Sequence, residues 1–283
     1  MNEIKRVYES MAASDTLKER LERTMKKEFR KGKIIKGCAG VVACLMIFSV
    51  AGVNLSPALA RAVAAVPGMD GVVRVLTFGR YQSSEGGYEA DITTPKIEGL
   101  LDKELEEKLN REFKENANAV IAAYEKDVKA LKEAFGDETV HMGIDSDYII
   151  KTDNDDILAL DVYILYTAGS SSTQHSFYTI DKKTGTLLTL PGLFRDGADY
   201  VTPISAYIKA EMERQNREED GLFFLDGEQE DFDGFEQIQP DQNFYIDKNG
   251  NLVIAFDKYE VAAGAQGSPE FVIPQEVIKT ILK

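Results

Sequence analysis

Residues 34–60 read IIKGCAGVVACLMIFSVAGVNLSPALA and decide how the whole chain is laid out. No charged residue occurs between Lys36 and Arg61, and a helix needs about 20 mainly apolar residues to cross a bilayer. Positively charged flanks stay in the cytoplasm. Six cations lie at the N-terminal side of the apolar run, namely Lys26, Lys27, Arg30, Lys31, Lys33 and Lys36. The segment therefore predicts a single-pass type II protein of the cell membrane, with a cytoplasmic N-terminus and an extracellular C-terminal domain.

A cleaved secretory signal peptide and a buried core helix are the alternative interpretations of residues 34–60. A cleaved signal begins close to the initiator Met, whereas about thirty residues come first here. A core helix does not account for the cations on one side only. Both observations favour the membrane span.

The formal net charge of −15 is divided unevenly along the 283 residues. Residues 1–36 contain 11 Lys and Arg against 6 Asp and Glu, a net charge of +5. Of the totals of 33 and 48, this leaves 22 against 42 for the rest of the chain, a net charge of −20. An acidic surface repels nucleic acid and attracts cationic partners. We therefore expect no nucleic-acid partner.

Residues that carry metal or redox chemistry are sparse. Cys38 and Cys44 both lie in the apolar segment, without an adjacent His, Asp or Glu that could complete a metal site. The stretch Asp153 to Asp156 lacks the Gly and the terminal Glu of a calcium loop and is typical of a turn. We expect no metal and no cofactor.

Catalytic motifs are equally sparse. His141 and His175 are the only histidines, and the chain contains no nucleophile elbow, zinc-protease motif or phosphate-binding loop. The run Ser170, Ser171 and Ser172 follows a glycine and lies close to His175, but it is more typical of a flexible polar loop than of a nucleophile. We expect no catalytic residue, and a protein that is not an enzyme.

The cytoplasmic head, residues 1–33, is predicted to form two short amphipathic helices. Apolar residues recur at helical spacing in each half, as Ile4, Val7, Tyr8 and Met11, and then Leu17, Leu21, Met25 and Phe29. Two such helices are too short to bury their apolar faces on each other. They need either the membrane surface or the groove of a protein partner.

Residues 61–283 are predicted to form an α+β domain, an antiparallel sheet packed with helices. A helical period runs from Lys103 to about Phe135, with Asp102 as its N-cap, as one helix or as two pieces with a single break. Two further helices are expected over 201–213 and 275–282. Apolar runs bounded by turns predict strands over 72–81, 88–93, 148–150, 157–167, 176–180, 186–190, 244–246, 252–256 and 271–273.

A loop of small residues stands between the last two predicted strands. Residues 257–271 read DKYEVAAGAQGSPEF, and such a backbone-exposing loop suits recognition by close approach. A long hairpin loop without a ligand is the alternative. Taken with the serine run, the candidate ligand-binding residues are Ser170, Ser171, Ser172, Tyr259, Ala263, Gly264, Ala265 and Pro269.

Three segments resemble the RsiV-type membrane anti-sigma factors. FDKYEVAAGAQGSPEFVIP, residues 256–274, resembles their C-terminal signature, which also occurs in an extracellular domain found beside peptidoglycan deacetylases. YTIDKKTGTLLTLPGLF, residues 178–194, matches a second stretch of that domain. IKRVYESMAASDTLKERLERTM, residues 4–25, is similar to the helical segment that holds the sigma factor. The outer resemblance covers roughly residues 90–283.

The resemblance implies an anti-sigma factor for a sigma factor of the extracytoplasmic-function type. Ile4, Val7, Tyr8, Met11, Leu17, Leu21 and Met25 would bind the sigma factor. The outer domain would sense a signal, which in the type member is lysozyme. Signal peptidase would then cut near Ala58, Ala60 and Arg61, where Ala58-Leu59-Ala60 has the small-x-small form, and a site-2 protease would cut within the membrane.

The recognition loop departs from the family pattern. The family often has Val-Ala-Pro-Gly and an aromatic residue, whereas this chain has Ala263 before Gly264 and Ala265 after it. A rigid proline and an aromatic anchor are absent here, so lysozyme and another cationic envelope protein are both retained as candidate ligands. A membrane-tethered enzyme or accessory domain acting on cell-wall glycan is the alternative function.

Overall fold

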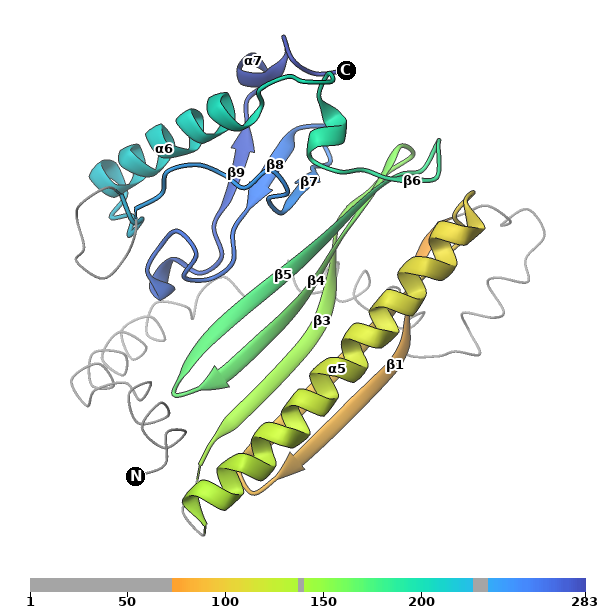
Figure 1. The fold of residues 1–283 in the computed structure, drawn as a ribbon, viewed down its shortest axis with the longest axis vertical. Coiled ribbons are helices and arrows are strands. Elements are labelled where there is room, and N and C mark those ends of the chain that lie inside the picture. The colour runs from red at the N-terminus through yellow and green to blue at the C-terminus, as the bar shows by residue number, and fades with distance from the viewer. Residues whose placement is uncertain (1–72, 137–139, 226–233) are drawn as a thin grey trace, which may run out of the picture.

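The structure is a computed structural model that describes residues 73–136, 140–225 and 234–283 (Figure 1). The predicted head, the predicted span and the cleavage residues Ala58, Ala60 and Arg61 lie outside the described residues. Within the described ranges, no helix is long and apolar enough to cross a membrane. The described chain forms two sheets with their own helices, which confirms the mixed α+β class.

The larger sheet has six strands in the order β1-β2-β3-β4-β5-β6. Their bounds are Arg74–Glu85, Tyr88–Glu98, Met142–Asp153, Ile157–Ala168, Ser170–Asp181 and Thr186–Leu187. Neighbouring strands are antiparallel except β2 and β3, which are parallel, so the prediction of a wholly antiparallel sheet was wrong at this pair. A parallel pair needs a crossover connection, and the helix α5 (Lys103–Phe135) supplies it.

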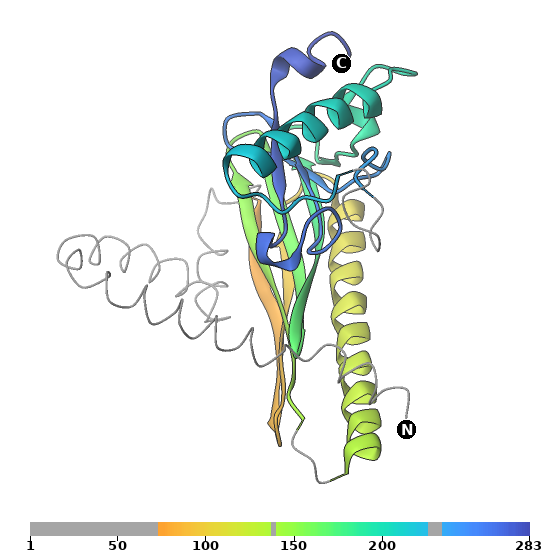
Figure 2. The ribbon, with the colours of Figure 1, turned by 90° about the vertical axis from the view of Figure 1, so that its left-hand side faces the viewer.

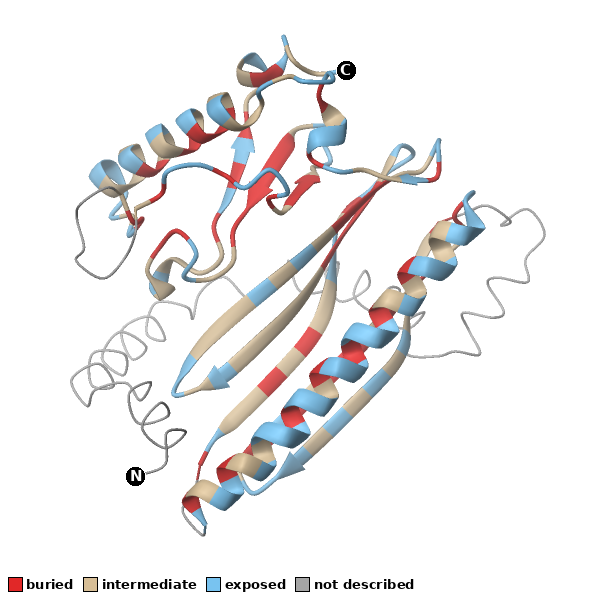
Figure 3. Cartoon of the chain, in the orientation of Figure 1, coloured by how far each residue is buried: buried red, intermediate tan, exposed pale blue. Residues whose placement is uncertain are grey.

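Helix α5 lies along one face of this sheet (Figure 2). It begins where predicted, because the Asp102 carboxylate accepts hydrogen bonds from the backbone N–H groups of Glu104 and Leu105 at 2.9 and 3.0 Å. It runs without a break for 33 residues to Gly136, whose φ of 62° is one that glycine tolerates. Its buried stripe (Figure 3) faces the sheet and includes Leu109, Phe113, Ala117, Val120, Tyr124, Leu131 and Phe135.

Strands β4 and β5 form a long hairpin whose tip projects away from the second sheet (Figure 1). The prediction that Ser170, Ser171 and Ser172 form a flexible loop was wrong, since β5 begins at Ser170. Gly169, with φ of 75°, makes the turn, and the three serines pair in register with Ala168, Thr167 and Tyr166. Pairing across the ladder therefore overrides the weak strand preference of serine.

The smaller sheet consists of β7 (Phe244–Ile246), β8 (Leu252–Ala255) and β9 (Glu270–Ile273), all antiparallel. Helix α6 (Val201–Glu218) packs Ile204, Ile208 and Met212 into a core with Phe256 and Phe271. It extends past the predicted residue 213, whereas α7 (Gln275–Ile278) is shorter than predicted. Short 3₁₀ turns cover Pro191–Leu193 and Gly264–Gln266.

The two sheets meet where β4 and β5 approach β7. The rings of Phe177 and Tyr245 stack with centroids 5.5 Å apart. The Thr152 hydroxyl donates to the carbonyl of Ile246 at 2.8 Å, and Lys151 Nζ lies 2.5 Å from Glu270 Oε1. This junction fixes the strand ends from which residues 257–269 depart.

Candidate ligand-binding surface

The recognition loop, defined here as residues 257–269, is docked on the β4–β5 hairpin. The Lys258 backbone N–H donates to the carbonyl of Thr173 at 3.2 Å, and Lys258 Nζ donates to Ser171 Oγ at 2.7 Å. The hydroxyls of Ser170 and Tyr259 are 2.9 Å apart. Three residues predicted to bind a ligand, from two segments about 90 positions apart in sequence, are therefore brought together.

Tyr259 is held in an unusual conformation at the surface. Its φ is 72°, in the left-handed region that few residues other than glycine adopt, and 40% of it is exposed. Its ring lies against Gly264 so closely that a Cβ there would stand 2.4 Å from ring atoms. Lys258 Nζ lies 5.2 Å from the ring centroid, at cation–π distance. Only glycine at position 264 lets the tyrosine take this place.

The rest of the loop is anchored from beneath. Ala262 is fully buried, and the Ala263 N–H donates to the carbonyl of Leu222 at 2.9 Å. Ala265 is exposed in the 3₁₀ turn, so it is the residue that the turn presents to solvent. Pro269 is buried, and its carbonyl accepts from Phe256, so this predicted ligand residue acts within the fold. Ser172 points to the opposite face of β5 from Ser171, as strand alternation requires.

A row of three polar side chains lies under the loop and was missed from the sequence. His175 Nδ1 is 3.0 Å from Asp161 Oδ1 and 3.1 Å from Oδ2, and its Nε2 is 3.1 Å from Ser268 Oγ. Asp161 is 1% exposed. An aspartate in the middle of the apolar strand ILALDVYILYTA was the available signal, because a buried carboxylate needs a partner.

The titration of His175 reflects these neighbours. Burial lowers the pKa of the imidazole, but the hydrogen bond and charge of Asp161, with the charges of Asp257 and Glu270, outweigh burial and raise the pKa above its ordinary value. Asp257 is half-buried, and burial raises the pKa of its carboxyl although it accepts the His175 backbone N–H.

An acidic strip crosses the sheet face opposite α5 and reaches the middle of the β4–β5 hairpin at Tyr163. It consists of Asp91, Asp145, Asp147 and Tyr163, since Asp91 pairs with Asp145 and Asp147 with Tyr163 in register. Burial, followed by the charges of Asp145 and Asp147, raises the pKa of Tyr163 to about 12. Burial raises the pKa of Asp147, and Asp145 raises it further. Asp91 is already paired with Arg80 of the neighbouring strand, so Asp145 and Asp147 are the carboxylates of the strip that can receive cationic side chains.

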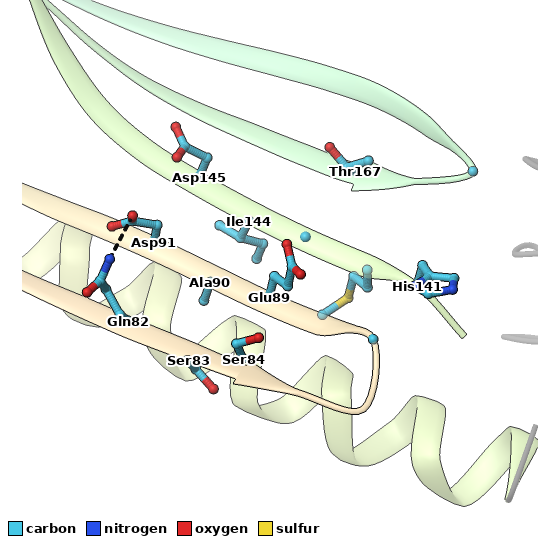
Figure 4. A pocket seen from close by; sticks show the side chains of 14 residues that line it. Gln82, Ser83, Ser84, Glu89, Ala90, Asp91, His141, Ile144, Asp145 and Thr167 are labelled. Carbon is cyan, nitrogen blue, oxygen red and sulfur yellow. Dashed lines mark hydrogen bonds between the residues drawn. The ribbon is translucent and has the colours of Figure 1, made fainter. Parts of the chain in front are cut away.

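A cavity of about 780 Å³ opens at one end of this strip (Figure 4). Asp91, Asp145 and Glu89 supply its carboxylates, and Gln82 Nε2 donates to Asp91 Oδ2 at 3.0 Å. Thr167 and Gly169 also line it, so it adjoins the hairpin tip. Within the described ranges, no group of three or more metal-ligating side chains is placed to hold a metal ion.

The chain is 32% identical over 283 residues to the anti-sigma-V factor RsiV of Bacillus subtilis (strain 168). The alignment covers 100% of this chain and 96% of that protein. The chain belongs to the RsiV family of anti-sigma factors. Anti-sigma function and a sigma-factor partner follow from this membership.

Two protein-family profiles also match this RsiV-family chain. "Protein of unknown function (DUF3298)" matches residues 192–276, which include the smaller sheet and the recognition loop. "Deacetylase PdaC" matches residues 82–169, from within β1 to the hairpin turn. A crystal structure of a DUF3298-family member from Bacteroides fragilis is similar in fold, with a TM-score of 0.53 and 15% identity, covering 76% of this chain and 95% of that one.

The predicted sigma-factor-binding residues and the predicted cleavage residues of this family member lie outside the described ranges, and their roles stay predictions. The same is true of ligand binding by the recognition loop. The structure places Ser170, Ser171, Tyr259, Gly264 and Ala265 at one surface.

Proposed function

We propose that this RsiV-family chain is a single-pass membrane anti-sigma factor whose extracellular domain binds a cationic envelope protein such as lysozyme. Residues 1–33 hold an extracytoplasmic-function sigma factor at the cytoplasmic side, and ligand binding outside leads to its release. The observation that carries the proposal is the recognition loop, docked against the β4–β5 tip next to a strip of carboxylates. Identity along the whole chain supports the same function.

Charge supports a basic ligand. The net charge of −20 beyond residue 36 creates a field that speeds the encounter with a cationic protein. Lysozyme is such a protein. The exposed residues where the recognition loop contacts the β4–β5 hairpin are Ser170, Tyr259 and Ala265. They offer hydroxyls and one aromatic ring as contacts.

Release is proposed to follow from two cuts. Ligand binding exposes the segment around Ala58, Ala60 and Arg61 to signal peptidase. The site-2 protease then cuts within residues 34–60, where Gly37, Gly40 and Gly52 weaken helical structure. The freed head no longer tethers the sigma factor to the membrane.

Calorimetry with the full-length chain in detergent and lysozyme, at low and at moderate salt, tests the outer half of the proposal. Binding that survives moderate salt indicates a formed interface, since screening weakens exposed charge pairs with a Debye length of about 8 Å. Absence of binding, or binding that vanishes with salt, would contradict lysozyme as the ligand.

The structure also favours a second candidate, a domain that hydrolyses cell-wall glycan substituents. Ser268, His175 and Asp161 stand in the order of a nucleophile, a base and its orienting carboxylate. A deacetylase profile matches residues 82–169, a range that contains Asp161 but neither His175 nor Ser268. Labelling of the full chain by a fluorophosphonate probe, lost in Ser268→Ala, and release of acetate from N-acetylated glycan oligomers would support it. No labelling and no acetate would exclude this candidate.

A further inference from the structure

His175 is in contact with both ends of the recognition loop. Its backbone N–H donates to the carboxylate of Asp257, the first loop residue, at 2.8 Å. Its Nε2 lies 3.1 Å from the hydroxyl of Ser268, next to the last loop residue. Its carbonyl accepts from Asn243 Nδ2 at 2.9 Å, from the segment that leads into β7. One strand residue thus closes the loop at its base.

The position of His175 is itself fixed by a buried charge. Asp161 lies one strand away on β4, is 1% exposed, and is in contact with the imidazole through both carboxylate oxygens. A buried carboxylate without an opposite charge is strongly destabilising. The imidazole ring also stacks on Phe177 with centroids 5.9 Å apart, so it has little room to turn.

The other charged and titratable groups around this pair come from every neighbouring element. Asp257 of the loop and Glu270 of β9 favour the protonated imidazole, and Tyr163 of β4 lies beside it. Lys151 of β3 pairs with Glu270, and its Nζ lies 5.9 Å from the Phe177 ring. Tyr245 of β7 donates to the other Glu270 oxygen at 2.9 Å. Carboxylates therefore outnumber cations around His175.

We propose that His175 is the positioning residue of the recognition surface: protonated and paired with Asp161, it holds both ends of the recognition loop in the ligand-binding conformation. Loop order then decreases as the pH rises and the imidazole loses its proton. The Nε2–Ser268 hydrogen bond survives deprotonation, since the Ser268 hydroxyl can donate as well as accept, but it loses the charge assistance that makes such bonds roughly twice as strong. At the same time the His175–Asp161 contact changes from an ion pair to a hydrogen bond between a neutral imidazole and a carboxylate. The effect is a loosening of the loop. Its consequence for ligand affinity rests on the function proposed above, because a preordered loop binds more tightly.

Hydrogen–deuterium exchange of the full-length chain at pH 6 and pH 8.5 tests the proposal, with protection expressed relative to the unfolded chain at each pH. In the wild type we expect protection of residues 262–268 to fall by about two- to tenfold at pH 8.5, the range of one hydrogen bond. Asp161→Asn should remove this pH dependence. His141→Gln, which changes the other histidine, should retain it.

Ser268→Ala removes the hydrogen bond between the loop and His175 but leaves the His175–Asp161 pair in place. It should lower loop protection at both pH values while β4 and β5 keep wild-type protection, because His175 and Asp161 stay in contact. Wild-type loop protection that does not change with pH would overturn the proposal, as would an unchanged pH dependence in Asp161→Asn. If Asp161→Asn does not fold, unchanged loop protection in Ser268→Ala would overturn it equally.

Lysozyme affinity, measured by calorimetry at the same two pH values, extends the test to function. We expect affinity to fall by about two- to tenfold at pH 8.5 in the wild type and in His141→Gln, but to stay constant in Asp161→Asn. Binding with the same affinity at both pH values in the wild type would contradict the link to ligand binding. If lysozyme does not bind at all, the ligand proposal fails, while the exchange experiment still decides the role of His175.

Discussion

Gly264 shapes the recognition surface because it has no side chain. The Tyr259 ring occupies the space where a Cβ would stand, at 2.4 Å from the built position. No positive φ is required at Gly264, so the requirement for glycine comes from the space that the tyrosine takes. A side chain at 264 would push Tyr259 off the loop and away from Ser170.

Gly264→Val is therefore expected to weaken lysozyme binding by at least about tenfold, or 1.4 kcal/mol, in calorimetry with the full-length chain. Gly79→Val is the matched control, since nothing lies within 4 Å of a Cβ at that position and it belongs to β1. Equal affinity in the two variants would show that Tyr259 and its loop are not part of the interface.

His175→Leu should lower the free energy of unfolding by about 3 kcal/mol, the lower end for removing one partner of a buried charge pair, because 14% of the histidine side chain is exposed. Denaturant unfolding measures this change. Combining it with Asp161→Leu should recover part of the loss, because no buried carboxylate is then left unpaired. A loss within about 0.5 kcal/mol for His175→Leu, the range of ordinary surface substitutions, would contradict a stabilising pair.

The same pair predicts how stability depends on pH. The pKa of His175 is raised in the folded chain, so its contribution is complete below the ordinary histidine value of about 6.5 and is lost as the pH rises through the raised pKa. Stability should thus decline on the alkaline side of about pH 6.5, and this decline should be absent in His175→Leu. Thermal unfolding at a series of pH values measures this decline. The same decline of stability with pH in His175→Leu as in the wild type would contradict the account.

Among the elements, helix α5 was predictable from local signals, apart from the break that the sequence allowed, and the pairing of the sheet was not. A capping aspartate, an apolar stripe and a terminal glycine are local signals, and all three lie within residues 102–136. The parallel pairing of β2 with β3 depends on where α5 returns the chain, which no local pattern records. Strand β5 was predicted to begin at Ser176, six residues late, because serines resemble loop until their partner strand is known.

In the candidate site, too, one part was predictable from local sequence and another part was not. The loop around Gly264 is visible as a run of small residues, and a family resemblance directs attention to it. The bonds from His175 to Asp161 and to Ser268 join positions 14 and 93 residues apart, and only the folded sheet brings them together.

Asp102→Ala tests the cap of α5. Loss of a side chain that accepts two backbone N–H bonds should destabilise the chain by about 1 kcal/mol in thermal or denaturant unfolding. Glu107→Ala serves as the control on the same helix, because the Glu107 side chain is 77% exposed and its ion pair with Arg111 spans 4.0 Å. Equal stability of the two variants would mean that the cap does not contribute.

At the scale of the whole molecule, the chain places a basic head and an acidic body on opposite sides of residues 34–60. The body presents a docked loop beside carboxylates, and family membership gives the chain a sigma-factor partner. In the proposed function, a signal outside reaches the head through proteolysis of the segment that precedes β1.

The head should bind its sigma factor through the apolar stripe. Leu21→Glu is expected to abolish co-purification of the co-expressed sigma factor with the full-length chain, because a charge would enter the buried face of the predicted helix. Glu22→Gln, one position along and off the stripe, should leave the complex intact. Normal recovery of the complex with Leu21→Glu would exclude this stripe as the binding face.

The most direct test of the proposed function follows the sigma factor in cells that express the full-length chain. Cell fractionation before and after a sublytic dose of lysozyme measures how much sigma factor stays with the membrane. We predict that it is membrane-bound at first and moves to the soluble fraction after lysozyme, and that Gly264→Val prevents the move while Gly79→Val does not. A sigma factor that is soluble before the signal, or that stays at the membrane after it, would contradict the account.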